Sequence, residues 1–223
     1  MKGRITRLGL LGALLGYPSA ALAQSAGPPR FELGAGVIWD GQQTLGARAA
    51  NETTSGGGTL ALFNSSSELA SAAGFEGRVG VRVTRSIVLE ADATYVKPQL
   101  RIALSGDSEN AAPVTATETI QQFTVGGSVV WYVPGQTRRI APFAIAGVGY
   151  LRQLHEAATL VDTGHYYQFG GGVSTLLIGP GHLHTAGIGV RADLRALVRS
   201  RGVAFDGGTA TSPAVGLSAF VRF

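Results

Sequence analysis

The sequence of 223 residues contains no cysteine, so disulfides and thiolate metal sites are excluded. Charged residues make up only 14% of the chain, and Lys2 and Lys97 are its only lysines. A soluble protein of this size normally carries many charged residues on its surface. The low charge, together with a positive mean hydropathy, indicates that much of the surface contacts something other than water.

The formal charge of +4 comes mostly from one end of the chain. Lys2, Arg4 and Arg7 lie among the first seven residues, and residues 1–23 contain no acidic residue. Without these three bases, the chain has 15 basic and 14 acidic residues. The high isoelectric point is therefore no argument for a nucleic-acid partner, and none is expected.

Long hydrophobic runs are also lacking. The basic start is followed by the apolar residues 8–16 and by Ala21-Leu22-Ala23, the pattern of a secretory signal peptide cleaved before Gln24. A membrane-anchoring helix is the weaker alternative, because such a helix needs about 20 apolar residues. No later run has that length, so the mature protein is expected to lack a transmembrane helix. We expect a signal peptide at residues 1–23 and one β-barrel domain at 24–223.

What the sequence does contain is alternation with a period of two, which predicts β-strands with two unlike faces. The last ten residues show it most clearly, because every second residue counted back from the carboxy-terminal Phe223 is apolar. These residues are Val215, Leu217, Ala219, Val221 and Phe223.

Similar patterns predict eight strands in all, longer than the roughly 9–11 residues that a transmembrane β-strand needs. Long segments between the strands, chiefly 41–71 and 199–212 and also 105–114 and 154–164, are expected to be loops, and they alternate with short turns. Within the first of these loops, Thr59–Phe63 could prolong a hairpin. Pro98 predicts a bend, and the faces of segment 140–152 stay ambiguous. The expected strands are 31–40, 73–84, 87–104, 115–133, 140–152, 165–178, 184–198 and 214–223.

Alternation alone does not say which face points outward, since a soluble lipocalin-like barrel has its apolar face inside. Two observations favour lipid outside: small residues on the polar face suit a narrow filled lumen, and aromatic residues fall near the strand ends as two interfacial belts. Closing the barrel also satisfies every backbone group in the membrane. The predicted belts comprise Phe31, Trp39, Tyr95, Trp131, Tyr167 and Phe223.

Charges on the inner face need partners, because an unpaired buried charge is costly. Arg222 is expected at the depth of Glu32. Depending on the register of the first hairpin, either Arg82 lies opposite Glu90 or Arg78 lies opposite Asp92. The expected network is Glu32, Glu76, Arg78, Arg82, Glu90, Asp92, Arg191, Asp193, Arg195 and Arg222. This polar plug either only holds the barrel together or forms a gated narrow channel.

With an export signal, eight strands and a terminal Phe223, the chain resembles the small eight-stranded outer-membrane barrels related to the transmembrane domain of outer-membrane protein A. The resemblance implies an all-β, antiparallel up-and-down transmembrane barrel in the bacterial outer membrane, in contact with its lipids. It also implies that the barrel-assembly machinery recognises the last strand.

The expected function is a structural or adhesin-like surface role, with any ligand bound by the loops. A porin-like channel is the first alternative. The second is a lipid-modifying enzyme, as some barrels of this size are, with His155 and His165 near Glu156 and Asp162. His182 and His184 lie at the opposite end, and two ligands are a weak metal signal. No catalytic, metal or cofactor site is therefore predicted.

Overall fold

The computed structural model describes residues 30–108, 112–134, 140–155, 160–179, 187–201 and 208–223. Eleven β-strands account for most of this part of the chain. None of the described residues forms a helix long and apolar enough to cross a membrane. The expected signal peptide and the histidines at 182 and 184 lie outside the described residues.

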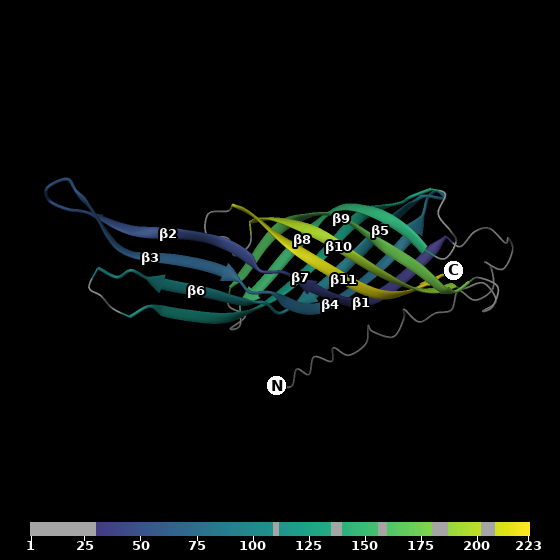
Figure 1. The fold of residues 1–223 in the computed structure, drawn as a ribbon, viewed down its shortest axis with the longest axis horizontal. Helices are drawn as coiled ribbons and strands as arrows, with labels where there is room; N and C mark the ends of the chain where they lie inside the picture. Colours follow the sequence, from purple (N-terminus) through teal and green to yellow (C-terminus); the bar gives the residue numbers. More distant parts are fainter. Residues whose placement is uncertain (1–29, 109–111, 135–139, 156–159, 180–186, 202–207) are drawn as a thin grey trace, which may run out of the picture.

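Eight of the strands form a closed antiparallel barrel in which each strand pairs with both of its neighbours. Closure is made by the first and last strands, with Glu32 paired to Arg222 and Gly36 paired to Ser218. Figure 1 shows the tilted strands of this barrel and the carboxy terminus at one end. In chain order the barrel strands are β1 (Phe31–Asp40), β4 (Ala72–Arg82), β5 (Ile87–Val96), β7 (Val114–Tyr132), β8 (Ile140–His155), β9 (Val161–Ile178), β10 (Gly187–Arg201) and β11 (Thr209–Arg222).

The remaining strands, β2 (Gln43–Thr53), β3 (Thr59–Leu69) and β6 (Gln99–Ser105), lie outside the barrel. With the first part of β7 they make a second sheet in the order β2-β3-β6-β7, which we call the extension. It projects beyond the barrel at the end opposite the carboxy terminus (Figure 1). The prediction of a long loop at 41–71 was therefore wrong, except for the hairpin suggested at Thr59–Phe63, which falls at the start of β3. Much of this segment is exposed on both faces, so no apolar alternation marks its strands.

Two other predicted loops are shorter than expected. The strand β8 continues to His155 and β9 begins at Val161, within the loop predicted at 154–164. Similarly, β10 continues to Arg201 and β11 begins at Thr209, within the loop predicted at 199–212. The bend at Pro98 is confirmed, because β5 ends at Val96 and the chain enters the extension as β6 at Gln99.

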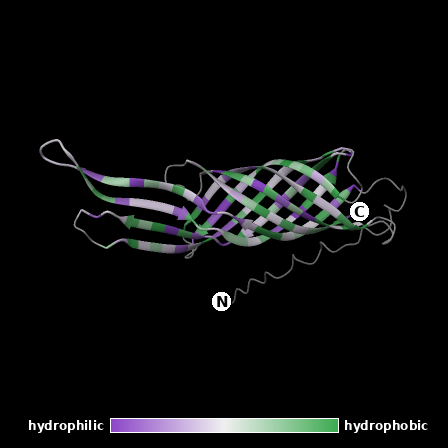
Figure 2. Ribbon diagram, viewed as in Figure 1, coloured by the Kyte–Doolittle hydropathy of each residue, from purple (hydrophilic) through white to green (hydrophobic). Residues whose placement is uncertain are grey.

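The barrel has its apolar side chains outside and its charged side chains inside. Leu217 is 57% exposed on the outer wall, whereas Arg191 is 1% exposed in the lumen. Figure 2 shows the resulting alternation of hydropathy along the barrel strands. The ambiguous faces of β8 are also settled, because Phe143 and Ile145 point into the barrel and Val148 points outward. This polarity is the reverse of that of a soluble barrel.

Candidate functional site

The charged side chains of the barrel are concentrated in the lumen, and the first of them lie at the end with the carboxy terminus. Arg222 donates from Nη2 to Oε2 of Glu32 at 2.6 Å, because the β1–β11 register sets these residues opposite each other. Arg82 also lies at this end, but no ion pair of the described residues includes it. Its guanidinium donates to the carbonyl of Arg85 at 3.0 Å and lies 5.3 Å from the ring centre of Tyr132.

The central part of the lumen holds a connected set of ion pairs, which we call the central cluster. Arg195 joins two carboxylates, with Nη2 2.7 Å from Oε1 of Glu76 and Nε 2.5 Å from Oδ1 of Asp193. Arg191 lies 3.3 Å from the other oxygen of Asp193 and donates to Glu90 at 2.7 Å. Side chains from three strands, β4, β5 and β10, thus cross-link the barrel from inside.

Arg78 extends the central cluster without completing its hydrogen bonds. Its Nε lies 3.6 Å from Oε1 of Glu90, and all three of its guanidinium nitrogens lack a hydrogen-bond partner among the described residues. The side chain lies across Gly34, where a Cβ atom would come within 2.7 Å of Nε. The small residue at 34 therefore makes room for the arginine.

The register of the first hairpin is the second of the two predicted, with Arg78 opposite Asp92 and Arg82 opposite Val88. The side chains of Arg78 and Asp92 nevertheless contact other residues than each other. Asp92 accepts hydrogen bonds from Tyr166 at 2.9 Å and from Gln168 at 3.0 Å, across the lumen on β9. In a barrel this narrow, a side chain reaches the opposite wall as easily as the next strand, so backbone register does not fix the ion pairs.

A further group of polar residues at the end near the extension, here the upper cluster, was missed from the sequence. Arg199 forms an ion pair with Asp40 and donates to Gln43 at 2.7 Å. Ser212 donates to Asp40 at 3.1 Å, and Gln122 donates to the same carboxylate at 3.2 Å. Arg199 was missed because it had been assigned to a loop. Arg199 follows Arg195 by four residues, as Arg195 follows Arg191, and an even spacing puts all three on one face of a strand. This spacing was the available signal.

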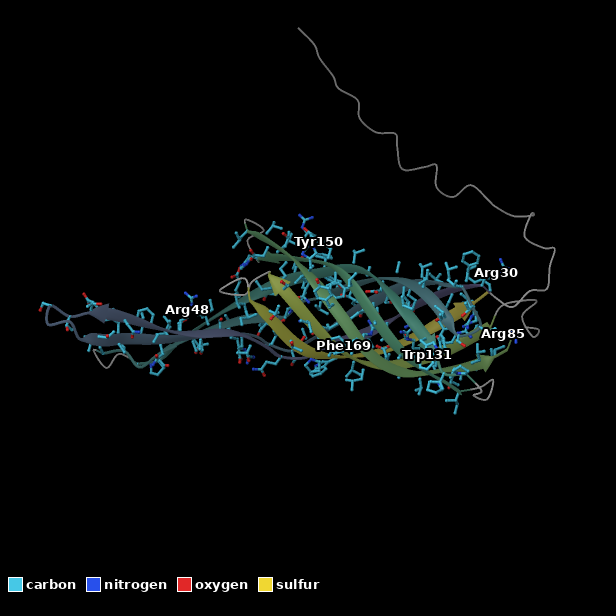
Figure 3. The ribbon with its side chains drawn as sticks, turned by 90° about the horizontal axis from the view of Figure 1, so that it is seen from above. Arg30, Arg48, Arg85, Trp131, Tyr150 and Phe169 are labelled. Atoms are coloured by element: carbon cyan, nitrogen blue, oxygen red, sulfur yellow. The ribbon has the colours of Figure 1, made fainter. Side chains whose placement is uncertain are left out.

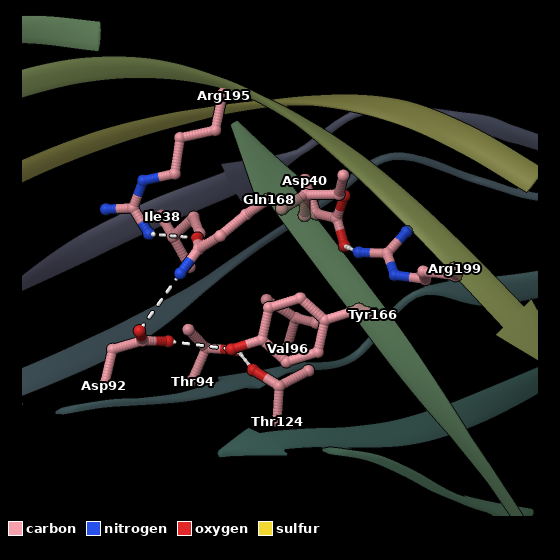
Figure 4. Close-up of a pocket in the computed structure, with 11 residues that line it drawn as sticks. Ile38, Asp40, Asp92, Thr94, Val96, Thr124, Tyr166, Gln168, Arg195 and Arg199 are labelled. Atoms are coloured by element: carbon pink, nitrogen blue, oxygen red, sulfur yellow. Dashed lines mark hydrogen bonds and ion pairs between the residues drawn. The ribbon is translucent and has the colours of Figure 1, made fainter. Parts of the chain in front are cut away.

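Little free space remains between these groups. A cavity of about 20 Å³ lies between the central and upper clusters, which is room for about one water molecule. Figure 4 shows Tyr166, Gln168 and Asp92 meeting around it. The lumen is not purely polar as predicted, since buried apolar side chains such as Val130 and Ile145 fill it at the end with the carboxy terminus.

Tyr166 on β9 fits into the lumen only because the residues level with it on the next two strands of the wall, β8 and β7, are glycines. Its ring lies directly over Gly126 and Gly149, and a Cβ on either would overlap the ring. A Cβ on Gly149 would also lie 2.6 Å from the carbonyl oxygen of Val125. The two glycines therefore hold open the space that the ring of Tyr166 occupies.

We expect Gly149→Ala to destabilise the barrel by about 1–3 kcal/mol, because the overpacked wall must shift. Urea unfolding in lipid vesicles measures this loss. The control is Gly77→Ala, where an added Cβ meets nothing within 4 Å on the outer wall. Equal stability of the two variants would contradict the packing described for Tyr166.

The outer wall carries aromatic residues toward both ends. Phe31 and Phe223 stack with ring centres 6.1 Å apart at the end with the carboxy terminus, and Trp131 is 48% exposed there. Figure 3 shows Trp131 toward this end and Tyr150 toward the extension. Trp39 and Tyr167 are exposed as well. Tyr95 is only partly exposed, because its ring packs 4.6 Å from that of Phe123.

The apolar face of the last strand also lies on the outer wall. Leu217, Val221 and Phe223 are exposed, with Val215 and Ala219 on the same face. Phe223 continues the pairing beyond β11, because its carbonyl accepts from the Phe31 N–H at 2.8 Å. Recognition of this strand by assembly machinery stays a prediction.

A closed barrel with an apolar outer wall and a charged interior can be solvated only by lipid around its middle. This observation decides the architecture. The chain is an eight-stranded β-barrel of the outer-membrane type.

Comparison with known proteins adds structural likeness only. No protein-family model matches the sequence, and neither does any curated protein. Among solved structures, the barrel is similar to Neisserial surface protein A (18% identity, 86% of this chain and 95% of that chain, TM-score 0.49). It is also similar to the outer membrane protein OprG from Pseudomonas aeruginosa (10% identity, 87% of this chain and 95% of that chain, TM-score 0.47). A third similar structure is Ail, the attachment invasion locus protein of Yersinia pestis (10% identity, 88% of this chain and 100% of that chain, TM-score 0.44).

The histidines considered for catalysis lie on different sides of the barrel wall. His165 is exposed on the outer face, where its ring meets that of Tyr150 edge-on at 6.3 Å. His155 is largely covered at the rim near the extension, with Nδ1 2.9 Å from Glu118 and Nε2 3.1 Å from Asp162. The two rings do not form one site. Position 156 lies outside the described residues, and these contain no metal-binding group of three His, Cys, Asp or Glu.

His155 is expected to be protonated over a wider pH range than a free histidine. Its partial burial alone would lower the pKa, but the hydrogen bonds and negative charges of Glu118 and Asp162 outweigh burial and raise the pKa above 6.5. With a carboxylate at each ring nitrogen, the imidazole links β7, β8 and β9, and in its protonated form it clamps them together. This arrangement does not suit a general base.

A group whose pKa is raised on folding stabilises the folded state fully below its unfolded pKa, and the effect is lost as the pH rises through the folded pKa. Raising the pH to about 8.5 should therefore weaken the rim around His155 and Asp162. Amide protons there should exchange faster than expected from the normal increase of the intrinsic exchange rate with pH. In His155→Gln this excess disappears. An NMR titration that gave a pKa of 6.5 or lower for His155 would contradict the clamp.

Proposed function

We propose that the protein resides in the bacterial outer membrane and acts at the cell surface as an adhesin-like interaction protein. The observation that supports this proposal is the extension, a four-stranded sheet that leaves the barrel at the end away from the carboxy terminus. It lies beyond the aromatic residues near that end of the barrel, so the proposed orientation places it outside the cell.

The extension exposes apolar side chains that lipid does not cover in this orientation. Phe63 and Leu104 are 39% and 40% exposed, and Val114 is 60% exposed. These residues, with Leu62, line a hollow of about 300 Å³ between β3, β6 and the start of β7. Exposed apolar surface with a recess is typical of an interaction site.

The filled lumen does not favour the porin-like alternative, because the central and upper clusters leave space for about one water molecule. Rigid barrels commonly carry their function on the segments that they display. The structural role of the lumen charges and the surface role of the extension are thus compatible.

Adhesion of bacteria that display the protein tests this proposal. We expect a non-adherent host to gain binding to polystyrene beads when it displays the wild-type chain, and to lose most of this binding with Phe63→Ser and Leu104→Ser combined. Arg85→Gln, at the opposite end of the barrel (Figure 3), is the control and should bind like wild type. Equal binding of wild-type, variant and non-displaying cells would overturn the proposal. Stepwise ion conductance in planar bilayers would favour a channel instead.

A further inference from the structure

The extension ends in a strand with a free edge. Of the described strands, β2 pairs only with β3, so its other side presents backbone N–H and C=O groups without a ladder partner. Natural proteins usually protect such edges with proline, lysine or a covering segment. Residues 46–53 contain neither proline nor lysine, and apart from Gly46 and Ala50 they are exposed.

The hairpin geometry shows which residues of β2 present these groups. The Thr54 N–H donates to the carbonyl of Gly58 at 2.8 Å, so the backbone of Thr54 points toward β3. The register break near Ala50 skips Leu62 on β3 and leaves β2 regular there. Because backbone direction alternates along a strand, Ala47, Ala49, Asn51 and Thr53 direct their N–H and C=O groups away from β3.

This pattern restricts how β2 can pair with a second copy of itself. In an antiparallel pair, outward-directed residues exchange hydrogen bonds with outward-directed residues. One such register is centred on Ala50, with Ala49 opposite Asn51 and Ala47 opposite Thr53 of the second copy. In that register Arg48 of each copy lies opposite Glu52 of the other.

Arg48 and Glu52 occupy non-hydrogen-bonded positions in this register, where opposing side chains lie closest. Both side chains are exposed. The two-fold axis that passes through the Ala50 pair therefore produces two identical ion pairs, each between Arg48 of one copy and Glu52 of the other. Shifting the register by two residues in either direction removes both ion pairs, so charge selects the arrangement.

We propose that β2 is a homotypic docking edge, at which two copies of this chain join their extensions into one continuous antiparallel sheet. The inference rests on the proposed surface function and names its partner as a second copy. The strand runs outward from the barrel, so its antiparallel mate must run the opposite way and its barrel must lie at the far end. Two barrels joined in this way belong to facing membranes, and the contact therefore links neighbouring cells.

The other free edge of the extension does not have this property. Residues 114–119 at the start of β7 pair with β6 on one side, and β8 joins β7 only from Ile120. This edge is shorter, and its only charged residue is Glu118. No self-paired register of that edge brings opposite charges together.

Cell clumping with charge-reversed variants tests the proposal. We expect Arg48→Glu and Glu52→Arg each to weaken clumping at least ~10-fold, because each places like charges opposite at both ends of the contact. Cells that display Arg48→Glu should clump with cells that display Glu52→Arg, because that mixture restores both pairs. Arg101→Glu, on exposed β6, is the control and should clump like wild type.

The outcomes are distinct. Recovery of clumping in the mixed population, and in the double variant Arg48→Glu with Glu52→Arg, supports the β2 contact. Clumping that is unaffected by either reversal overturns it, as does failure of the mixture to clump when surface labelling shows both variants at wild-type levels. If wild-type cells bind polystyrene but never clump, the homotypic contact is wrong and the proposed surface function remains.

Discussion

Replacing Arg195 by methionine is expected to destabilise the barrel by about 3–5 kcal/mol, since it leaves buried charge without its partner. Arg195 is 3% exposed and holds both Glu76 and Asp193, while its Nη1 donates to Gln168 at 3.2 Å. Methionine keeps much of the side-chain volume, so the loss reports on charge rather than on a cavity. Urea unfolding in lipid vesicles, followed by the fluorescence of Trp39 and Trp131, measures it.

The matched control is a solvent-exposed ion pair of the extension. Arg101 lies 3.7 Å from Glu68, and both side chains are substantially exposed. Arg101→Met should cost less than about 1 kcal/mol. A loss in Arg195→Met no greater than that in Arg101→Met would show that the central cluster does not hold the barrel together.

Placing a charge on the outer wall should have the second large effect. Leu217 is 57% exposed and pairs with Val37 near the middle of the wall, where lipid is expected. Leu217→Arg is expected to cost about 2–4 kcal/mol, because the guanidinium must enter the apolar part of the bilayer. The fraction that migrates as the folded species in unheated detergent gels, and urea unfolding of that fraction, give the effect.

The neighbouring residue provides the control, because it points the other way. Ser218 is buried, and its hydroxyl has no hydrogen-bond partner among the described residues. Ser218→Ala should therefore change stability by less than about 0.5 kcal/mol. If Ser218→Ala were as harmful as Leu217→Arg, the inner and outer faces of β11 would be wrongly assigned.

Much of the barrel could be predicted because it depends on a short-range pattern. Alternation in β11 and β10 placed Leu217 outside and Arg191 inside, and the pairing of Glu32 with Arg222 required only that the first and last strands meet. The contact of Asp92 with Tyr166 could not be predicted, because it crosses the lumen and depends on barrel diameter and strand tilt. No local pattern in the sequence encodes either quantity.

The extension escaped prediction for a different physical reason. Much of β2 is exposed on both faces, so residues such as Ala47, Arg48 and Ala49 carry no alternation that would reveal a strand. Its backbone hydrogen bonds to β3 define it instead. The same open exposure leaves its edge free, which is why the segment missed from the sequence is the one to which the proposed contact is assigned.

Cysteine labelling of intact cells tests the central account most directly, and the chain has no cysteine of its own to interfere. Ser55→Cys places a thiol at the exposed tip of the β2–β3 hairpin, and Leu217→Cys places one on the outer wall of the barrel. A membrane-impermeant maleimide should label Ser55→Cys on intact cells, but Leu217→Cys only after unfolding. Labelling of Ser55→Cys only after lysis would place the extension in the periplasm. Ready labelling of folded Leu217→Cys would show that the wall faces water and would contradict the membrane-spanning barrel.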